Sequence, residues 1–313
     1  MRAFGILAGI ASLLIAVPAT AQTSPHLAEL ETRITATATE NPGEYGIAAL
    51  DLATGELIGV NTDMAFPMAS TMKIAVAAAY LADVDAGRRS LDDTIAGTSA
   101  YALMDRMMVR SDNYATDLLI ARLGGPDAVN GWLRENRFEN IRVDRTIAQL
   151  LAARRNLWED EDTSTPRAML ELLRRIDAGD LLSATSRSTL LDMMRRCSTG
   201  RNRIKGLLPN AAVVEHKTGT LNGYSSDVGF ITLPTGQRLA VAFFARGGNN
   251  RPAVIATAAR AIYDGFGSEE TAQTASIQTP EFPTAPQATG RVYLDATYDR
   301  PAIADVPEMA PSQ

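Results

Sequence analysis

The sequence has 313 residues, 46% of them hydrophobic, and a formal net charge of −6 at pH 7, which is the composition of an ordinary globular protein. A single cysteine, Cys197, excludes an internal disulfide, and with only two histidines it supplies no convincing cluster of metal ligands. No basic face that would neutralise phosphates stands out, so nucleic acid is not an expected partner. We expect Cys197 to be a buried, inert packing residue.

The first 21 residues have the pattern of an export signal. Arg2 is followed by an apolar run from Phe4 to Val17 and by the small residues Ala19-Thr20-Ala21 before Gln22. The run is shorter than the roughly 20 residues of a membrane-spanning helix, which disfavours the alternative of an uncleaved membrane anchor. We therefore expect residues 1–21 to be cleaved as a signal peptide and the mature protein to be periplasmic, without a stable membrane anchor.

Strand-like and helix-like patterns follow one another along the rest of the chain. Strands are predicted at residues 45–50, 56–60, 213–216, 227–233 and 238–246, with turns at 51–55 and 234–237. Helices are predicted from 74 to 81 and on toward Gly87, at 101–109 and 114–123, at 166–176 after the capping residue Thr165, and at 252–266. This order predicts an α+β fold, an antiparallel sheet flanked by helices, with strands from both ends of the chain and an inserted all-helical region.

The predicted domain organisation follows from this order of elements. We expect one catalytic domain over residues 22–267, with a helical region at about 66–194 and an α/β region formed by about 25–65 and 195–267. Residues 268–313 carry seven acidic residues against Arg291 and Arg300 and are rich in Ala, Thr, Pro and Gln. Their composition predicts a flexible acidic tail.

Ser70 and Lys73 stand at the start of the alanine-rich helix and are three residues apart, which puts a hydroxyl and an amine on one helix face. Serine alone is a weak nucleophile. An amine whose pKa is lowered by burial and by other cations can take its proton, and the helix N-terminus favours developing negative charge. Taken alone, the pattern also fits a helix cap followed by a solvated lysine.

Two further motifs carry polar side chains at the ends of predicted elements. In Ser111-Asp112-Asn113 the hydroxyl could relay a proton and the Asn113 amide could bind a substrate amide, although such a triplet is often only a helix N-cap. In Lys217-Thr218-Gly219-Thr220, placed at a strand end, the lysine and the hydroxyls could hold a carboxylate, and Gly219 would let a ligand approach the backbone. The alternative for this segment is a plain transition from strand to turn.

The three motifs, in this order and on these elements, form the signature set of class A β-lactamases and penicillin-binding proteins. The chain resembles class A serine β-lactamases over roughly residues 27–267, and the segments 66–69, 118–125 and 162–166 agree with the resemblance. This resemblance implies a β-lactamase/transpeptidase-like fold. It also implies an enzyme without metal or organic cofactor that acts, as an expected monomer, on a small-molecule β-lactam or a cell-wall peptide.

The same resemblance implies roles in acylation. Ser70 would be acylated by the β-lactam or a related amide, with Lys73 as its candidate base, and Ser111 would pass a proton to the leaving nitrogen. Asn113 would orient Lys73 and the substrate. The backbone N–H groups of Ser70 and Thr220 would form the oxyanion hole.

A carboxylate-binding group is implied as well. Lys217 and Thr218, followed by Gly219, would hold the carboxylate of the substrate. Arg203 resembles the extra arginine that some members place behind this group. The alternative for Arg203 is a solvated surface arginine.

The chain departs from the family in the loop that supplies the water-activating glutamate, Glu-x-x-Leu-Asn, which we do not find. Counting back from Asp162 without gaps puts Gln149 at the glutamate position and Ala153 at the asparagine position, and a neutral amide cannot be a general base. Glu159 or Glu161 could take this role or be solvated acids of a loop. The stretch from Lys73 to Ser111 is also shorter than in the family, which predicts a more open cleft.

Three functions compete at this point. The leading one is a serine β-lactamase that hydrolyses the β-lactam amide through a Ser70 acyl-enzyme. The alternative is a periplasmic acyl-serine hydrolase or penicillin-binding protein that acts on peptidoglycan peptides or other amides or esters, with slow deacylation of β-lactams. The third is a catalytically idle binding domain that retains the fold.

Overall fold

The computed structural model describes residues 25–153 and 156–268, so the expected signal peptide and nearly all of the expected tail lie outside the described residues. The chain divides into two units, residues 1–277 and 278–313, and every described residue belongs to the first. Within the described residues, no helix combines the length and the apolar character needed to cross a bilayer.

A five-stranded antiparallel sheet with the strand order β2-β1-β9-β8-β7 is the centre of the fold. Its strands are β1 (Glu44–Asp51), β2 (Leu57–Val60), β7 (Val213–Leu221), β8 (Tyr224–Thr232) and β9 (Arg238–Arg246). The predicted hairpins β1–β2 and β8–β9 are confirmed. Because β1 pairs with β9, the sheet joins segments from both ends of the described chain, and it ends at β7, which carries Lys217–Thr220.

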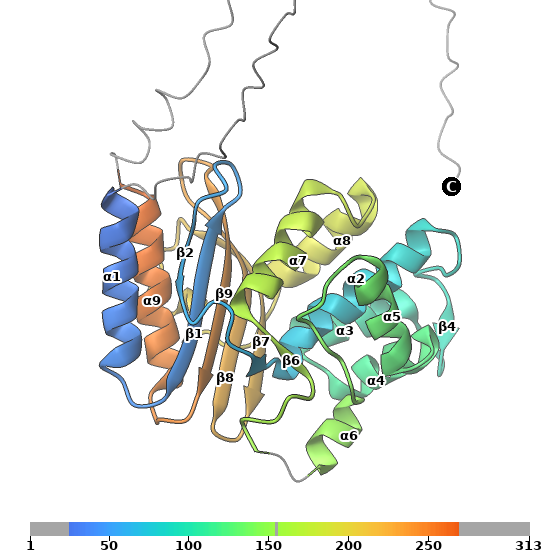
Figure 1. Cartoon of the computed structure of the whole chain (residues 1–313). Helices are drawn as coiled ribbons and strands as arrows, with labels where there is room; N and C mark the ends of the chain where they lie inside the picture. The colour runs from blue at the N-terminus through green and yellow to red at the C-terminus, as the bar shows by residue number, and fades with distance from the viewer. Residues whose placement is uncertain (1–24, 154–155, 269–313) are drawn as a thin grey trace, which may run out of the picture. The chain divides into compact units, whose positions relative to one another are not determined.

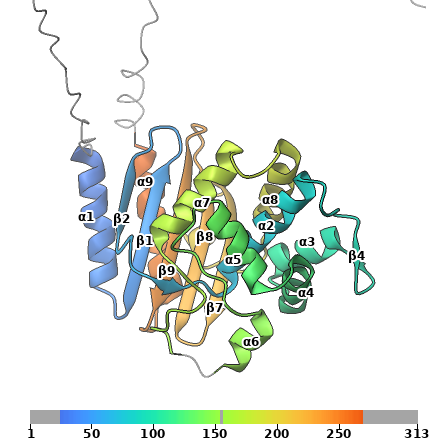
Figure 2. The same cartoon turned by 45° about the vertical axis from the view of Figure 1, so that its right-hand side comes forward.

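Helices lie against both faces of the sheet (Figure 1). On one face α1 (Pro25–Thr39) packs beside α9 (Arg251–Phe266). On the other, α7 (Pro166–Ala178) contacts β1 and β9. Beyond it lie α2 (Lys73–Asp85), α3 (Ala100–Arg110), α4 (Asn113–Leu123), α5 (Pro126–Glu135), α6 (Ile147–Ala152) and α8 (Ala184–Arg195), as Figure 2 shows from a second direction. The α+β class with helices on both sides of the sheet is thus observed.

Short elements complete the chain. The 3-10 helices are η1 (Ala69–Met72) and η2 (Ile204–Gly206), and the two-stranded pairs are β3 (Phe66–Pro67) with β6 (Thr163–Ser164) and β4 (Thr94–Ile95) with β5 (Thr98–Ser99). The β3–β6 pair joins the segment before Ser70 to the segment before α7.

Two hydrophobic cores follow from the alternation of side chains along the strands. In β9, Phe243 faces the core shared with α1 and α9, whereas the next residue, Phe244, faces the core shared with the other helices. Helix α2 is buried from Lys73 through Leu81, so its alanine-rich sequence lets neighbouring helices pack closely around it. Lys73 therefore enters the site from the middle of a core.

Several elements were not predicted, namely α1, α5, α6 and α8. Pro126 is the first residue of α5, a position that tolerates proline because its missing N–H needs no helical partner. Strand β7 also runs on to Leu221, because each of its residues pairs with β8, which begins at Tyr224 and not at Asp227. Lys217–Thr220 therefore lie within the last half of β7.

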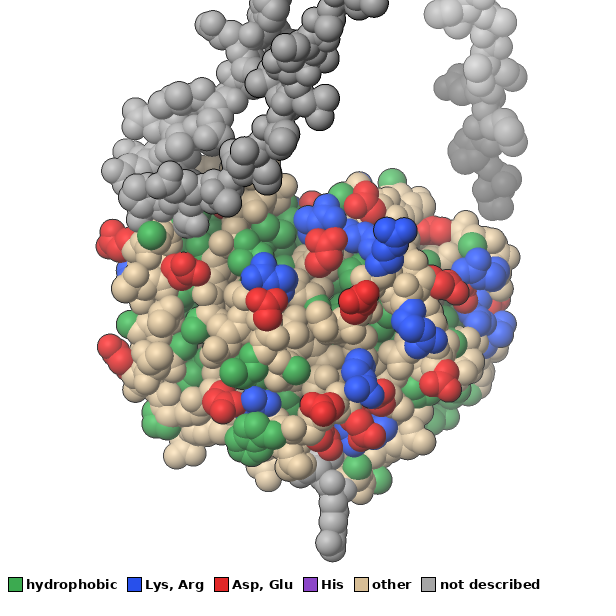
Figure 3. Space-filling model, viewed as in Figure 1, with side chains coloured by type: hydrophobic (Ala, Val, Ile, Leu, Met, Phe, Trp, Pro, Cys, Tyr) green, Lys and Arg blue, Asp and Glu red, His purple; other side chains and the backbone are tan. Residues whose placement is uncertain are grey.

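Charged side chains of both signs are interspersed on the face shown in Figure 3. Exposed pairs of the protein surface include Arg167 with Asp63, at 2.7 Å, and Arg174 with Glu171, at 2.8 Å. Such solvated pairs contribute about 1 kcal/mol or less each to stability. The charges that matter for chemistry are the buried ones described next.

Candidate active site

Ser70 lies on η1, immediately before α2. Ala69 has φ +50°, a left-handed conformation that is uncommon for a residue other than glycine. The turn is held on both sides, because the Thr71 hydroxyl donates to Met68 O at 2.7 Å and the Met68 N–H donates to Asp162 O at 2.8 Å. Ser70 is therefore fixed, half-buried, at the N-terminal end of a buried helix.

Lys73 is fully buried, and its ammonium points at the Ser111-Asp112-Asn113 segment. Its Nζ donates to Ser111 O at 2.9 Å, to Ser111 Oγ at 3.2 Å and to Asn113 Oδ1 at 2.9 Å. The alternative of a solvated lysine is therefore wrong. The structure brings the first two motifs together.

The charge state of Lys73 is set by its surroundings. Burial lowers the pKa of Lys73 and the charge of Lys217 lowers it further, to about 7, against the opposing effect of Asp112 and Asp117. A lysine with a pKa near neutrality is partly unprotonated at pH 7. Lys73 can therefore accept a proton there, as a general base must.

Ser111 joins the two lysines. It ends α3 in the left-handed conformation, with φ +59°, and this directs its hydroxyl between α2 and β7. Ser111 Oγ accepts from Lys73 Nζ at 3.2 Å and from Lys217 Nζ at 2.9 Å. Because both lysines donate, the hydroxyl hydrogen of Ser111 is left to point at a third group. Asp112, between Ser111 and Asn113 in the sequence, is the N-cap of α4, because its side chain accepts from the Ala115 N–H. The alternative that this triplet is a helix N-cap is therefore right for Asp112 only.

Lys217 and Thr218 occupy the part of β7 that faces this cluster. Lys217 is fully buried, and burial lowers its pKa to about 8. Its second hydrogen bond goes to Thr218 O at 2.9 Å. The Thr218 hydroxyl lies 2.5 Å from the hydroxyl of Thr199, which the sequence did not single out.

Gly219 packs tightly against the turn that carries Ser70. A Cβ at this position would lie 2.4 Å from Ser226 Oγ, 2.6 Å from Met68 O and 3.0 Å from the Ala69 Cβ. The missing side chain thus makes room for the turn that carries Ser70. Gly219 allows β7 to pack directly against η1.

Arg203 lies behind β7 and is only 7% exposed. Its Nη1 donates to Gly219 O at 2.7 Å and to Ser226 O at 2.8 Å, and its Nη2 donates to Thr220 Oγ1 at 2.6 Å. The alternative of a solvated surface arginine is therefore wrong. Its charge is held just behind the strand that carries Lys217 and Thr218.

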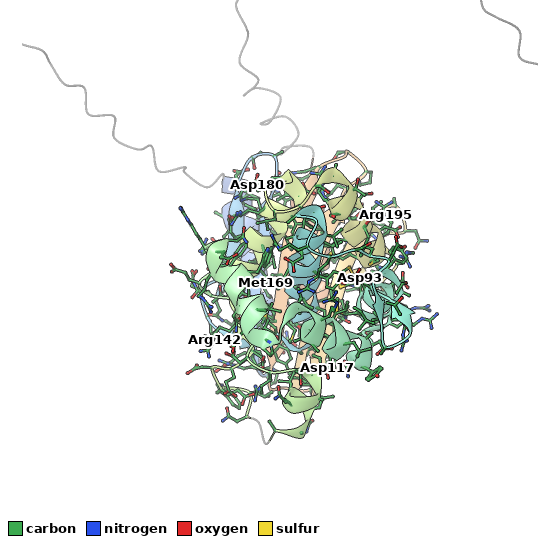
Figure 4. All side chains as sticks on the ribbon, turned by 90° about the vertical axis from the view of Figure 1, so that its right-hand side faces the viewer. Asp93, Asp117, Arg142, Met169, Asp180 and Arg195 are labelled. Atoms are coloured by element: carbon green, nitrogen blue, oxygen red, sulfur yellow. The ribbon has the colours of Figure 1, made fainter. Side chains whose placement is uncertain are left out.

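Gln149 lies on α6 and its side chain is committed to that helix. Its Oε1 accepts from Thr146 N at 2.9 Å, and Thr146 Oγ1 accepts from Gln149 N, which forms a capping box. Asp117, labelled in Figure 4, also supports this helix. Its carboxylate accepts from the Ile147 and Ala148 N–H groups at the start of α6. Gln149 is exposed, and Ala153 ends the helix.

The acidic residues after α6 gather around Arg145. This arginine pairs with Glu159 at 2.9 Å, with Glu161 at 3.0 Å and with the buried Asp162 at 2.5 Å. Glu159 and Glu161 both line a pocket of about 430 Å³ that also touches Ala69, beside Ser70. Glu159 does not fit the alternative of a solvated loop acid, because its side chain is only 20% exposed. The half-exposed Glu161 fits that alternative better.

Sequence reasoning missed the residues that support the site, namely Asp117, Arg145, Thr199, His216 and Asp227. Only Arg145 had a readable signal, the acidic run from Glu159 to Asp162. The others act through partners that the fold brings together from distant parts of the chain.

A serine at a helix N-terminus, a buried lysine on the same helix and a second serine between two lysines define a site for acyl transfer to serine. The family model described as "Beta-lactamase enzyme family" matches residues 29–266. The chain is 31% identical to β-lactamase VEB-1 of Pseudomonas aeruginosa, over 64% of this chain and 76% of that protein. It is 30% identical to the carbapenem-hydrolyzing β-lactamase KPC of Klebsiella oxytoca, over 72% and 85%.

A solved structure gives the same result. The class A β-lactamase of the last common ancestor of Gram-negative bacteria superposes with a TM-score of 0.72 at 34% identity, covering 76% of this chain and 99% of that chain. The chain belongs to the β-lactamase enzyme family, and the predicted resemblance to its class A serine enzymes is confirmed, together with the α+β fold class.

Proposed function

We propose that this chain is a serine β-lactamase that opens the β-lactam amide through an acyl-enzyme on Ser70. The observation that carries the proposal is the convergence of Lys73 and Lys217 on Ser111 Oγ, next to the turn that holds Ser70. This arrangement supplies a nucleophile, a base and a proton donor within one buried cluster. Such a set is what cleavage of an amide by a serine requires.

In the proposed acylation, Ser70 Oγ attacks the β-lactam carbonyl and its proton passes to the neutral amine of Lys73. As the C–N bond breaks, Ser111 gives its free hydroxyl hydrogen to the leaving nitrogen, and Ser111 regains a proton from the lysines that surround its oxygen. Asn113 holds Lys73 in place through the 2.9 Å hydrogen bond to Nζ. Ser111 Oγ already accepts a hydrogen bond from each lysine, so the proton that Ser111 gives up can be replaced directly.

The remaining residues would bind charge on the substrate. The N–H groups of Ser70 and Thr220 belong to η1 and β7, which pack against each other, and would donate to the oxyanion, where one donor contributes roughly 3 kcal/mol toward the transition state. Lys217 and the Thr218 hydroxyl would hold the substrate carboxylate. Arg203 would add its positive charge from behind β7.

Intact-protein mass spectrometry with a chromogenic cephalosporin tests the proposal, with wild type and Ser70→Ala followed for adduct mass and absorbance together. A transient adduct on wild type, absent from Ser70→Ala, with continuing turnover is the expected result. Absence of both adduct and turnover in wild type would contradict the proposal.

A second candidate, a penicillin-binding protein or acyl-serine hydrolase with slow release of β-lactams, is favoured by a specific observation. Gln149 is committed to the cap of α6, and the acids on the pocket beside Ala69 are paired with Arg145. A stable adduct without turnover in the same experiment would favour this candidate. Cell-wall peptides or other amides or esters would then be the substrates.

The compartment is part of the proposal. The signal pattern of residues 1–21 supports export to the periplasm and release as a protein without a membrane anchor. The mass of the protein recovered from the periplasm of a Gram-negative expression host tests this point. A chain that begins near Gln22 is expected, and a full-length chain in the membrane fraction would contradict it.

A further inference from the structure

A row of polar side chains runs from the interior of the sheet to the Thr218 hydroxyl. The His216 Nδ1 lies 2.7 Å from Asp227 Oδ1, and both side chains are fully buried. The thiol of Cys197, just after α8, lies 3.3 Å from Thr199 Oγ1, which lies 2.5 Å from Thr218 Oγ1. Cys197 is buried as expected, and its thiol makes a polar contact with Thr199.

His216 connects the two parts of the row. Its Nδ1 is taken by Asp227, whereas its Nε2 is buried without a hydrogen-bond partner of standard geometry among the described residues. The Cys197 thiol and the His216 imidazole are close enough to shift each other's pKa. The sulfur of Cys197 is therefore in contact with the Thr199 hydroxyl and under the influence of the His216 imidazole.

The cations around Cys197 favour its thiolate. They are His216 and Lys217 on β7 and Arg203 before η2, and the carboxylate of Asp227 on β8 keeps His216 charged. Burial raises the pKa of the Cys197 thiol, but the interaction with His216 and the charges of His216 and Lys217 lower it to about 6. Burial lowers the pKa of His216, and Asp227 outweighs this and raises it to about 9.

Either Thr199 or Thr218 can be the donor in the hydrogen bond between their hydroxyls. Which of them donates depends on whether the Cys197 sulfur is protonated. A protonated Cys197 donates to Thr199 Oγ1, so Thr199 donates to Thr218 and the hydrogen of Thr218 is free for a carboxylate. A thiolate accepts from Thr199, so Thr218 must donate to Thr199 and presents only lone pairs to the substrate.

We propose that Cys197 is a positioning residue whose protonation reverses the hydrogen bond between Thr199 and Thr218 and thereby sets how well the site accepts substrates with a carboxylate. This inference rests on the proposed function, because Thr218 has to face the substrate carboxylate. Cys197 would thereby distinguish substrates by whether they carry a negatively charged carboxylate. A neutral ester of the same β-lactam lacks the charge that the Thr218 hydrogen stabilises.

The test compares the acylation rate of a free-acid β-lactam with that of its methyl ester from pH 5 to pH 7, measured by adduct mass. This range lies below the pKa of about 8 of Lys217, whose charge would also bind the carboxylate. The acid-to-ester ratio cancels the titration of Lys73, which affects both substrates. In wild type we expect the ratio to fall about tenfold as pH rises through 6, because one hydrogen bond to a charged group is lost. In Cys197→Ser the hydroxyl stays protonated, so the ratio should remain high at every pH.

Two further variants separate this role from a structural one. Thr199→Val removes the acceptor to which Thr218 would donate, so the Thr218 hydrogen stays free and the ratio should be high and independent of pH. Ser198→Ala alters the exposed neighbour, whose hydroxyl donates to Val109 O, and should behave as wild type. A ratio that is independent of pH in wild type, or that falls equally in Cys197→Ser, would overturn the inference while leaving the proposed function intact.

NMR can measure the same coupling between Cys197 and the substrate carboxylate through the titration of Cys197. Cys197 is the sole cysteine of the chain, so the NMR signal of cysteine labelled with 13C at Cβ belongs to it without assignment. In Ser70→Ala, the free-acid β-lactam should raise the titration midpoint of this signal and the methyl ester should leave it unchanged, because linkage is reciprocal. An unchanged midpoint under a bound acid contradicts the inference, whereas no adduct on wild type with either substrate removes the proposed function as well.

Discussion

Lys73 and Lys217, from helix α2 and strand β7, donate hydrogen bonds to the same oxygen, Ser111 Oγ, at 3.2 and 2.9 Å. Two buried ammonium groups that share one acceptor repel each other. The repulsion reinforces the effect of burial and holds the pKa of Lys73 at about 7. The charge of Lys217 therefore contributes to making Lys73 a base.

This relationship predicts a shifted pH profile in Lys217→Met. The acylation rate of wild type should rise with pH through about 7, as Lys73 loses its proton, and level off above it. Without Lys217 the pKa of Lys73 rises, so the limb of the profile should move to higher pH. The substrate for this measurement is a β-lactam methyl ester, because it does not depend on Lys217 for carboxylate binding.

Lys205→Met is the control for that experiment, since Lys205 lies on η2 and makes none of the hydrogen bonds to Ser111. Its profile should coincide with that of wild type. A Lys217→Met profile with an unchanged midpoint would show that the two lysines are not coupled.

A substitution at Gly219 tests the packing of β7 on the nucleophile turn. In Gly219→Ala the new Cβ meets Met68 O at 2.6 Å and Ser226 Oγ at 2.4 Å, so strand and turn must move apart. We expect a loss of stability of about 1–3 kcal/mol and at least a tenfold slower acylation of Ser70. Urea unfolding and adduct formation measured by mass spectrometry check the two effects.

The matched control is Gly131→Ala, in the interior of α5, where the nearest atom to a new Cβ is Arg134 Nη2 at 4.0 Å. Alanine is the better helix former, so this variant should be unchanged or more stable by up to about 1 kcal/mol. Equal effects of the two substitutions would refute the role given to Gly219.

Local patterns predicted the elements that depend on local chemistry. The β1–β2 and β8–β9 hairpins are closed by short turns, and α7 begins at Pro166 with Thr165 as its N-cap, as predicted. Helix α1 was missed because no part of the sequence around it shows that its apolar residues pack on α9, more than 200 positions later. Strand β7 was cut short because its last residues owe their conformation to β8.

In the site, too, features set by local sequence could be predicted, whereas features set by distant partners could not. The motif residues could be found by their spacing, and the structure brings Lys73, Ser111, Asn113 and Lys217 into one hydrogen-bonded cluster. The burial of Arg203 could not be predicted, because its acceptors lie on β7 and β8. The commitment of Gln149 to a capping box depends on where α6 begins, which the sequence analysis did not place.

The loop acids predict how fast the acyl-enzyme is released. Glu159 and Glu161 are paired with Arg145 at 2.9 and 3.0 Å, which commits their carboxylate oxygens to the guanidinium and not to a water. We therefore expect Glu159→Gln and Glu161→Gln to slow deacylation less than tenfold, against the 10²- to 10⁴-fold that loss of a general base typically costs. The decay of the Ser70 adduct mass after removal of free β-lactam measures this rate.

Gln149→Ala serves as the comparison, since Gln149 is exposed and neutral and should leave deacylation unchanged. A loss of a hundredfold or more in either glutamate variant would instead identify that residue as the base. The pairing with Arg145 would then have to open when substrate binds.

Stability against pH tests the buried cluster of Cys197, His216 and Asp227. The pKa of His216 is raised in the folded state, so its contribution is complete below the unfolded value of roughly 6.5 and is lost as pH rises through about 9. The pKa of Cys197 is lowered to about 6, so its contribution is complete above the unfolded value of roughly 8.5 and is lost as pH falls toward 6. Between pH 6.5 and 8.5 the two dependences have opposite signs and largely cancel.

Wild type should therefore show a nearly constant free energy of unfolding in urea across this pH range, whereas Cys197→Ser should lose about 1–3 kcal/mol. Serine does not titrate, so only the histidine dependence remains, and Asp227 still holds the pKa of His216 above its unfolded value. Adding Asp227→Asn to Cys197→Ser should abolish the slope, and Ser198→Ala should follow wild type. Parallel curves for wild type and Cys197→Ser would mean that the thiol and the imidazole do not share a proton equilibrium, because the cancellation requires both to titrate.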